Sequence, residues 1–254
     1  MTPRPWVLAE SPWKLVEDTP YDVAVLPWGA TEAHNRHLPY ATDTIEAERL
    51  SIAAAELAWN AGAKVIVLPA VPFGVNTGQL DIKLCLNMNP STQVAVLADL
   101  VDSLSQQGIR KLVIANAHGG NDFKPAIREL QPQTDVFLCL INWYAVLDAR
   151  PYFTEPGDHA GEMETSLMMH FTPELVLPLS DAGPGRARPS RLTGMREGWV
   201  WAPRPWTQVT ADTGVGDPAA ATAAKGERVA AKLAERVSSF LIELAAADTD
   251  DLYG

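Results

Sequence analysis

The chain has 254 residues, of which 47% are hydrophobic, and its 20 basic and 31 acidic residues give a formal net charge of −11. This charge argues against nucleic acid and anionic membrane surfaces as partners, because both require clustered Lys and Arg. A small neutral or cationic substrate suits an acidic chain better. A chain of this size can bury one large core, so we expect one globular domain over residues 1–254.

Cysteine occurs twice, as Cys85 in IKLCLNM and Cys139 in VFLCLIN, and both positions lie in apolar runs. We therefore expect buried free thiols rather than a disulfide or a thiolate metal site, and a reducing cytoplasm as the compartment. The N-terminal residues lack the apolar core of a signal peptide, and no stretch approaches the roughly 18 apolar residues of a spanning helix. A soluble, unexported protein is expected.

The first two thirds of the chain alternate β-branched apolar runs with helical patterns, which is typical of a largely parallel sheet covered by helices. Strands are predicted over residues 22–28, 63–71, 110–115 and 134–141. Two helices are predicted between them, one from Thr42 or Asp43 to Gly62 and one over 91–108. The first helix has an apolar face formed by Leu50, Ala53, Ala54, Leu57 and Ala58. We expect a three-layer α/β/α fold.

The last third of the chain is less regular. A short helix is predicted for EMETSLMMHF, residues 162–171, and long loops for residues 177–218. The Trp-rich run GWVWAPRPW in these loops is expected to pack against the rest of the protein. A C-terminal helix is predicted over residues 219–247, with a core face at helical spacing. That face consists of Val229, Leu233, Val237, Phe240 and Leu244.

Possible metal ligands are densest in WGATEAHNRHLPYATDT, which follows the first predicted strand and contains Glu32, His34, His37 and Asp43. Ligands bind at the carboxyl ends of strands in open α/β sheets. Glu32 and His34 are two residues apart, so an extended segment directs both side chains to one side. The alternative is a surface loop that contains histidine by chance.

Two further clusters occur later in the chain. His118 follows the third predicted strand in IANAHGGND, and neighbouring strand ends would bring it to the first cluster. Alternatively, it is a turn histidine that caps a strand. In GDHAGEMETS, Asp158, His159, Glu162 and Glu164 lie where a helix begins. Acidic residues there can also merely cap the helix and complement its dipole.

Nitrogen and oxygen ligands without thiolates suit Zn²⁺, Mn²⁺ or Fe²⁺ at a catalytic centre better than a structural zinc site. A paired-metal centre can activate water and polarise a carbonyl, and it needs a bridging carboxylate, for which Asp43 is the candidate. The sequence contains no nucleophile elbow, phosphate loop or dinucleotide fingerprint that would indicate another chemistry.

Three segments resemble the motifs of the creatininase (creatinine amidohydrolase) family, in the same order and over about residues 20–176. They are LPWGATEAHNRHLPYATDT, IANAHGGND and DHAGEMETSLMMHFTPELV. The resemblance implies two divalent metals per chain, with Glu32 and His118 holding one, His34 the other, and Asp43 bridging them. It also implies the α/β/α fold and a homo-oligomer, commonly a hexamer.

Two departures from the family pattern bear on the site. Gly120 stands where creatininase has a ligand Glu, so we expect Glu164 to replace that ligand, with Glu162 as the alternative. Gln79 and Leu80 replace a Glu-His pair that many relatives carry. The substrate pocket has therefore changed, and creatinine is not the expected substrate.

The expected activity is that of a metal-dependent amidohydrolase, in which metal-activated water attacks the carbonyl of a small cyclic amide. His159 or Glu162 would move the proton to the leaving nitrogen, and Asn76, Thr77 and Trp201 would contact the substrate. One alternative is hydrolytic ring opening of a cyclic ketone such as a keto-inositol (inosose). A second, from another class, is a non-catalytic metal- or ligand-binding protein, against which the retained Glu, His and Asp ligands argue.

Overall fold

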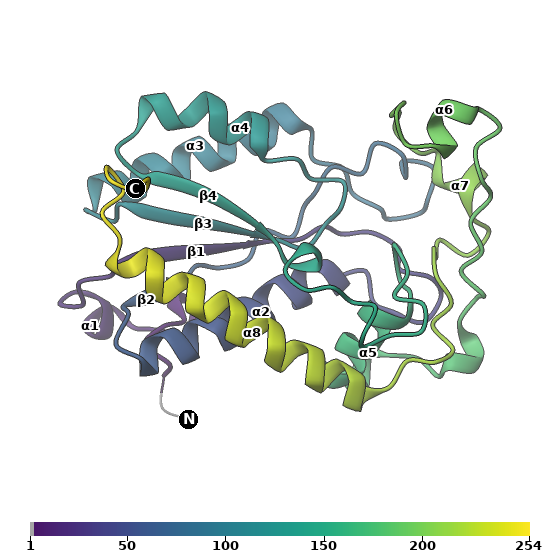
Figure 1. Cartoon of the computed structure of the whole chain (residues 1–254), viewed down its shortest axis with the longest axis horizontal. Coiled ribbons are helices and arrows are strands. Elements are labelled where there is room, and N and C mark those ends of the chain that lie inside the picture. The colour runs from purple at the N-terminus through teal and green to yellow at the C-terminus, as the bar shows by residue number, and fades with distance from the viewer. Residues whose placement is uncertain (1–2) are drawn as a thin grey trace.

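The computed structural model describes residues 3–254, which form one parallel sheet with helices on both faces (Figure 1). The strand order is β2-β1-β3-β4. All four predicted strands are confirmed, but the second is shorter than expected, since Pro69 lacks the amide hydrogen that would continue the ladder. The strands are β1 (Val23–Trp28), β2 (Val65–Val67), β3 (Lys111–Asn116) and β4 (Phe137–Asn142).

Helices connect the strands and cover the sheet. The helix predicted after β1 and the two predicted near residues 91–108 and 162–171 are confirmed, whereas α4 was not expected from the sequence. The α-helices are α1 (Trp13–Val16), α2 (Thr42–Asn60), α3 (Pro90–Gln106), α4 (Lys124–Leu130), α5 (Glu162–Phe171), α6 (Thr193–Arg196), α7 (Trp206–Val209) and α8 (Ala223–Ala246). Short 3-10 turns are η1 (Leu8–Glu10), η2 (Gln131–Gln133), η3 (Trp143–Ala145), η4 (Pro173–Leu175) and η5 (Leu179–Asp181).

Each face of the sheet packs against its own pair of helices (Figure 1). On one face, Leu26 and Ile114 pack with Leu97 of α3 and Phe123 beside α4. Successive strand residues point to opposite faces, so Val25 and Val113 belong to a second core with Ala54 of α2 and Leu241 of α8. These two cores confirm the predicted three-layer α/β/α fold.

Two predicted core faces differ in detail from the structure. On α8, Val229, Leu233 and Leu244 are buried, but Phe240 is 36% exposed and Val237 only half-buried. The buried stripe of α8 passes through Ser238 and Leu241 instead. On α2, Leu57 is 42% exposed, so the predicted face extends one residue too far around the helix. Which residues at the margin of a helical stripe are buried depends on the neighbouring elements rather than on periodicity.

The irregular segment from residue 177 to 218 is tied to the body of the protein at only some positions. Trp206 is buried, its amide donates to the Gly78 carbonyl at 2.9 Å, and its ring lies 4.8 Å from that of His159. Trp199 and Trp201, by contrast, are 72% and 84% exposed. The expectation that the Trp-rich run packs is therefore right for Trp206 and wrong for the other two.

Both cysteines are free, as expected, although Cys139 is half-buried and only Cys85 is fully buried. Burial raises the pKa of the Cys139 thiol to about 12, so this thiol is unreactive at neutral pH. Within residues 3–254, every helix is too short or too polar to cross a bilayer.

Candidate metal centre

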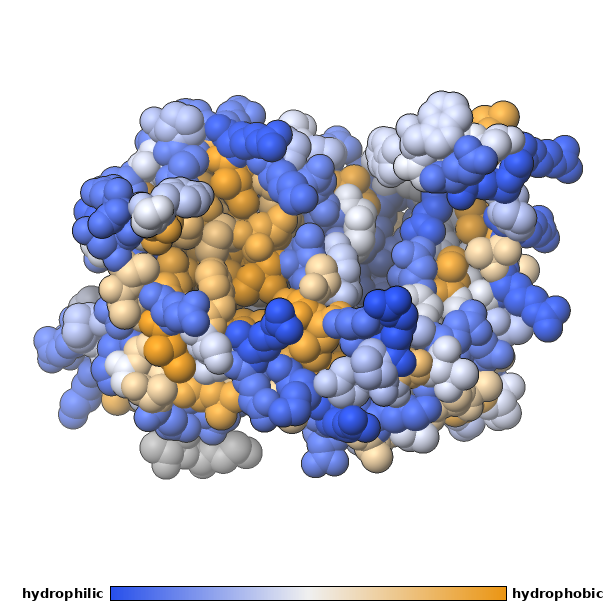
Figure 2. Space-filling view, viewed as in Figure 1, coloured by the Kyte–Doolittle hydropathy of each residue, from blue (hydrophilic) through white to orange (hydrophobic). Residues whose placement is uncertain are grey.

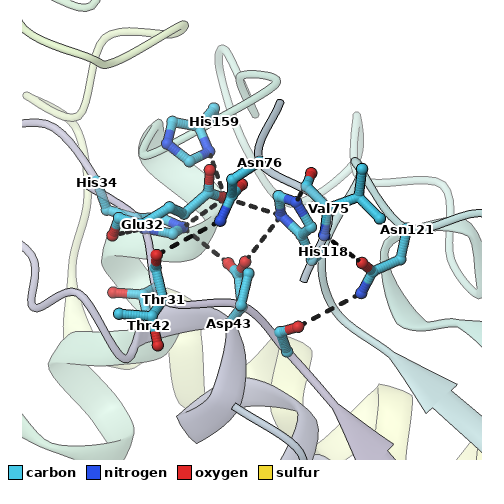
Figure 3. Close-up of polar contacts among 12 residues, drawn as sticks. Thr31, Glu32, His34, Thr42, Asp43, Val75, Asn76, His118, Asn121 and His159 are labelled. Carbon is cyan, nitrogen blue, oxygen red and sulfur yellow. Dashed lines mark hydrogen bonds and ion pairs between the residues drawn. The ribbon is translucent and has the colours of Figure 1, made fainter. Parts of the chain in front are cut away.

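Acidic and histidine side chains gather at the carboxyl ends of β1 and β3 (Figure 3). Glu32 and His34 lie in the segment after β1, and His118 lies directly after β3. Because β1 and β3 are neighbours in the sheet, these two segments leave it side by side. Asp43 enters from the first turn of α2. All four side chains are buried, so the sequence-predicted cluster is brought together in space.

Asp43 lies between two histidines, and each of its oxygens faces a different one. Asp43 Oδ1 is 2.8 Å from His34 Nε2, and Asp43 Oδ2 is 3.0 Å from His118 Nδ1. Glu32 Oε1 completes the second group, at 2.8 Å from His118 Nδ1. One carboxylate therefore connects two adjacent ligand sets, which is the arrangement that a shared carboxylate between two cations requires.

The segment at the start of α5 brings two more predicted residues to the cluster. Glu164, in the first helical turn, forms a possible ligand set with His34 and Asp43. His159 precedes the helix, and its Nδ1 lies 3.7 Å from Glu32 Oε1. In each of the three possible ligand sets among the described residues, the ligand atoms lie within 4.8 Å of one another.

The ring orientation of each histidine in the cluster is set by a backbone carbonyl. A carbonyl oxygen only accepts hydrogen bonds, so the ring nitrogen beside it carries the proton, and the nitrogen that faces the carboxylates has a free lone pair in the neutral ring. This is the tautomer of a metal-binding histidine. The contacts are His34 Nδ1 to Glu32 O at 3.2 Å, His118 Nε2 to Val75 O at 3.0 Å, and His159 Nε2 to Ala33 O at 2.9 Å.

The buried charges of the cluster depend strongly on one another. Burial lowers the pKa of His34, but Asp43 and Glu32 outweigh it and raise that pKa to about 10. The same balance, with Glu32 as the largest favourable charge, raises the pKa of His118 well above its usual value. Burial alone would raise the pKa of Asp43, but the two histidines outweigh burial, so the pKa of Asp43 lies well below its usual value. A cation that binds here must displace imidazolium protons, so its affinity falls as pH falls.

Glu162 does not belong to this cluster, although it begins the same helix. Its carboxylate accepts hydrogen bonds from the backbone amides of Thr154 at 2.9 Å and Glu155 at 3.0 Å, and it pairs with Lys225. Residues two apart on an α-helix are separated by more than half a turn, so Glu162 and Glu164 point to different sides. Glu162 points away from the cluster, so its position does not support the proton-transfer role that we expected for it. It does not support the alternative role as a metal ligand either.

Two other polar residues of the sequence clusters also lie apart from the possible ligand sets. The His37 Nε2 atom is 2.9 Å from Thr165 Oγ1, which ties the segment after β1 to α5. Burial, followed by the nearby His34, lowers the pKa of His37 to about 4. Asp158 pairs with Arg204 at the surface. Neither residue belongs to a possible ligand set among the described residues.

The position of Gly120 explains why the residue two after His118 is a glycine rather than a glutamate. A Cβ atom at Gly120 would overlap the Val75 carbonyl oxygen and the ring of His118. The same Val75 carbonyl orients His118, so the loop cannot move aside without disturbing that histidine. The carboxylate that creatininase carries two residues after this histidine has no room in this backbone, and Glu164 reaches the cluster from α5 instead.

Sequence reasoning missed two partners of the cluster. Gln79, which was noted only as a changed pocket residue, donates to Glu32 Oε2, and its own oxygen lies 3.3 Å from the Cys85 thiol. Glu46 is fully buried, and neither of its carboxylate oxygens has a hydrogen-bond partner. Glu46 lies three residues after Asp43 on α2, so helical spacing was the signal that could have found it.

We expect Glu46→Gln to stabilise the metal-free protein increasingly as pH rises. Burial, then the charges of Glu164 and Asp43, raises the pKa of Glu46 well above 4.5. A raised carboxyl pKa gives stability that is present below the unfolded-state pKa and is lost as pH rises towards the folded-state pKa, by up to about 1.4 kcal/mol per pH unit. Glutamine does not ionise, so the variant escapes this loss.

Thermal unfolding of chelator-treated protein between pH 5 and 8 measures the effect of Glu46→Gln. The exposed Glu56, on the same helix, provides the control variant Glu56→Gln, for which no pH-dependent difference is expected. A stability difference between wild type and Glu46→Gln that stays constant over this range would contradict the prediction.

A cavity of about 790 Å³ opens above the cluster. It lies beside the loops that carry α6 and α7, where the surface is hollowed (Figure 2). The three residues predicted to contact substrate, Asn76, Thr77 and Trp201, all line it, as do Glu32, Asp43, His118, His159 and Glu164. The possible ligands and the possible substrate contacts thus share one cleft.

The fold and this centre define a metal-dependent hydrolase, with buried histidines and carboxylates at the strand ends beneath an open cleft. The family model for creatinine amidohydrolase (creatininase) matches residues 9–241. The chain belongs to the creatininase family and is a metal-dependent amidohydrolase.

Individual relatives agree with this assignment. The chain is 30% identical over 230 residues to a mycofactocin precursor peptide peptidase of Mycobacterium tuberculosis, with 83% of this chain and 81% of the relative covered. A solved structure from Bacteroides fragilis, assigned as a creatinine amidohydrolase, is 43% identical with a TM-score of 0.92 and 98% coverage of both chains. A manganese form of creatininase is 21% identical, with a TM-score of 0.75 and coverage of 95% of this chain and 99% of its own. At that identity it shows the shared fold alone.

Proposed function

We propose that this protein hydrolyses an amide bond in a substrate larger than creatinine, using two divalent cations, Zn²⁺, Mn²⁺ or Fe²⁺. The observation that carries the proposal is the carboxylate of Asp43, whose two oxygens face His34 and His118. His34 Nε2 and Asp43 Oδ2 lack a partner in hydrogen-bonding geometry despite these short distances. Buried atoms of this kind fit a bound cation.

The residues divide into two sets around Asp43. Glu32 and His118 would hold one cation, and His34 and Glu164 the other, with Asp43 shared between them. This donor set of imidazoles and carboxylates, without thiolate, suits a catalytic divalent cation. Gln79 donates to Glu32 Oε2 and so leaves Glu32 Oε1 to face His118.

A pair of divalent cations, when bound, lowers the pKa of water and polarises a carbonyl. His159 is then the residue placed to move the proton. Its Nε2 donates to the Ala33 carbonyl, its Nδ1 faces the cluster, and its ring lies between those of His34 and Trp206 at 4.1 and 4.8 Å. With its Nε2 proton on the Ala33 carbonyl, His159 would accept a proton from the attacking water at Nδ1 and return it to the leaving nitrogen.

Asn76 offers a hydrogen-bond acceptor to the substrate. Its side-chain nitrogen donates to the Leu86 carbonyl at 3.0 Å and the Thr31 carbonyl at 3.4 Å, which orients the amide group. Its oxygen, Asn76 Oδ1, is buried without a partner, and the residue lines the cleft. The N–H of a bound amide would satisfy this oxygen. Thr77 and Trp201, both exposed at the cleft, are the proposed outer contacts.

The size of the cleft favours a larger substrate than the small cyclic amide that the sequence suggests. A volume of about 790 Å³ lies in the upper part of the range of roughly 300–1,000 Å³ for sites of drug-sized ligands. The relative from Mycobacterium tuberculosis is named as a peptidase of a precursor peptide. A short peptide or peptide-like amide is therefore the substrate class that we propose.

The ring opening of an inosose is less well supported. That alternative used the polar run of Asn76, Thr77 and Gln79 to bind hydroxyl groups, but the side chain of Gln79 is already engaged by Glu32 and Cys85. The polar groups of this run that remain, Asn76 Oδ1 and the Thr77 hydroxyl, suit the N–H and C=O of an amide as well as hydroxyl groups. These two residues therefore do not favour a polyol over an amide.

We expect creatinine to be turned over poorly or not at all. A hydrogen-bonding pocket discriminates against a substrate that leaves the buried polar groups of the pocket unpaired, by factors of roughly 10⁴ or more. Steady-state assays at saturating Mn²⁺ or Zn²⁺ should compare creatinine with lactams, short peptides and inososes, and the peptides should give the highest kcat/KM. Creatinine hydrolysis at a kcat/KM of about 10⁴ M⁻¹s⁻¹ or above would contradict the prediction, and absence of peptide hydrolysis would contradict the substrate class.

We further propose a cytoplasmic homo-oligomer, for which the family resemblance suggests a hexamer. Apolar residues gather on the surface over β4, between α4 and α8 (Figure 2). Phe137, Cys139 and Ile141 of this edge strand are only partly buried in the single chain. Such a face is a candidate contact between copies. Light scattering coupled to size-exclusion chromatography measures the subunit number.

A further inference from the structure

Several side-chain donors that line the cleft are already used within the protein. The Asn76 amide nitrogen donates to two carbonyls, that of Asn121 donates to Asn116 and Gly29, and Arg204 pairs with Asp158. Hydrolysis of an amide needs a donor for the carbonyl oxygen as well as an acceptor for the N–H. A donor without a protein partner near the cluster is therefore significant.

The hydroxyl of Tyr144 is such a donor. Tyr144 lies in η3, directly after β4, at the same edge of the sheet as the cluster, and it lines the cleft together with Asp43 and His118. Its neighbour Trp143 is buried and packs edge-on against the Tyr144 ring at 6.1 Å, which restricts the ring's position. Tyr144 is 37% exposed, so its side chain is open to the cleft that it lines.

The surroundings of Tyr144 leave its proton available. The nearby Asn116 side chain is engaged on both sides: its nitrogen donates to His118 O and Asn142 Oδ1 at 2.9 Å each, and its oxygen accepts from the amides of His118 and Asn121. Burial, followed by the charge of Asp43, raises the pKa of Tyr144. The phenol is therefore neutral at physiological pH and can donate a hydrogen bond.

We propose that the Tyr144 hydroxyl donates a hydrogen bond to the oxygen of the scissile carbonyl as that oxygen gains negative charge. Tyr144 would supply the donor and Asn76 Oδ1 the acceptor that together match the C=O and N–H of one amide. The hydroxyl keeps its proton throughout, and no covalent bond to tyrosine forms. The assignment deepens the proposed amide hydrolysis and rests on it for the identity of the substrate.

Tyr144→Phe tests this role, because it removes the hydroxyl and keeps the ring. Loss of one preorganised donor should lower kcat about 10²–10³-fold, with KM and metal content nearly unchanged. A measurement independent of turnover uses methylphosphonate, a tetrahedral oxyanion, titrated calorimetrically into Mn²⁺-loaded protein. We expect its affinity to fall roughly 10- to 100-fold in Tyr144→Phe, as for loss of one hydrogen bond to a charged group.

Tyr40→Phe is the matched control. Tyr40 is 37% exposed, as Tyr144 is, but its hydroxyl donates to the Lys83 carbonyl at 2.7 Å and it does not line the cleft. Its variant should bind methylphosphonate as the wild type does. Equal affinity of wild type and Tyr144→Phe, including no binding by either, would overturn the proposal, as would loss of metal from Tyr144→Phe. Failure to hydrolyse any amide, with methylphosphonate binding still dependent on Tyr144, would instead contradict the proposed substrate reaction.

Discussion

Asp43→Ala is expected to lose most of both metal ions and, with them, hydrolytic activity. The two oxygens of Asp43 face His34 and His118 at 2.8 and 3.0 Å, so a single substitution removes a ligand from both proposed sites. It also removes the contacts from Asp43 that hold His34 and His118 in position beside Glu164 and Glu32. Because even indirect partners of metal ligands are worth about 10- to 100-fold in affinity, we expect at least about 100-fold weaker binding at each site.

Elemental analysis of protein purified without chelator, followed by titration with Mn²⁺ or Zn²⁺, measures the loss in Asp43→Ala. Wild type should hold up to two ions per chain. The control is Asp99→Ala, which removes an exposed aspartate on α3, remote from the cluster. Full occupancy of two ions in Asp43→Ala would refute the shared role of this carboxylate, and loss of one ion alone would assign Asp43 to a single site.

The second large effect separates the two acidic residues at the start of α5. Glu164→Gln should weaken the cation held with His34 about 10- to 100-fold. Glutamine has the shape of glutamate but lacks the negative charge, so it is a poorer ligand for a divalent cation. The observation behind this expectation is the ligand set that Glu164 forms with His34 and Asp43.

Glu162→Gln should have the opposite pattern, with metals retained and the fold destabilised. The Glu162 carboxylate accepts from the amides of Thr154 and Glu155 and pairs with Lys225, which joins three segments of the chain. Lys225 is about one third exposed, which reduces the contribution of the ion pair itself. Loss of hydrogen bonds to a charged group should therefore lower the free energy of unfolding by about 2 kcal/mol.

Competitive metal titration and urea unfolding in chelator, applied to both variants, provide the comparison. The two substitutions are chemically identical and two residues apart, so each serves as the control for the other. If Glu162→Gln loses metal and Glu164→Gln retains it, the two assignments must be exchanged. If both lose metal, the start of α5 acts as a unit and neither glutamate can be singled out as the ligand.

The sequence by itself determined those features that depend on local periodicity and on strand ends. The β-branched runs predicted four strands, and the apolar spacing after β1 predicted α2, because burial of one face imposes these patterns. Glu32, His34, Asp43 and His118 could be grouped since they follow or flank strands whose carboxyl ends share one edge of a parallel sheet. No long-range information beyond the neighbouring order of β1 and β3 was needed.

Only the tertiary structure decided which side each helix turns to its neighbours. The spacing of EMETS allowed either Glu162 or Glu164 to reach the cluster, and the packing of α5 against α2 and α8 selected Glu164. Tertiary packing also decided that Glu46 is buried without a hydrogen-bond partner and that Phe240 is exposed. Helical periodicity states which residues share a face, whereas the rotation of that face depends on contacts with distant segments.

The cleft was likewise a product of the tertiary structure, because its walls come from segments far apart in the chain. Gln79 meets Glu32 across 47 residues, and the Trp-rich loop is held at Gly78 by the amide of Trp206. Tyr144 carries no motif that marks it in the sequence, and it becomes a candidate only because β4 lies beside β3 and ends at the cluster. Metal ligands that lie close together in the sequence can be predicted from their spacing. Residues that meet only because distant segments of the chain pack together can be identified only in the folded structure.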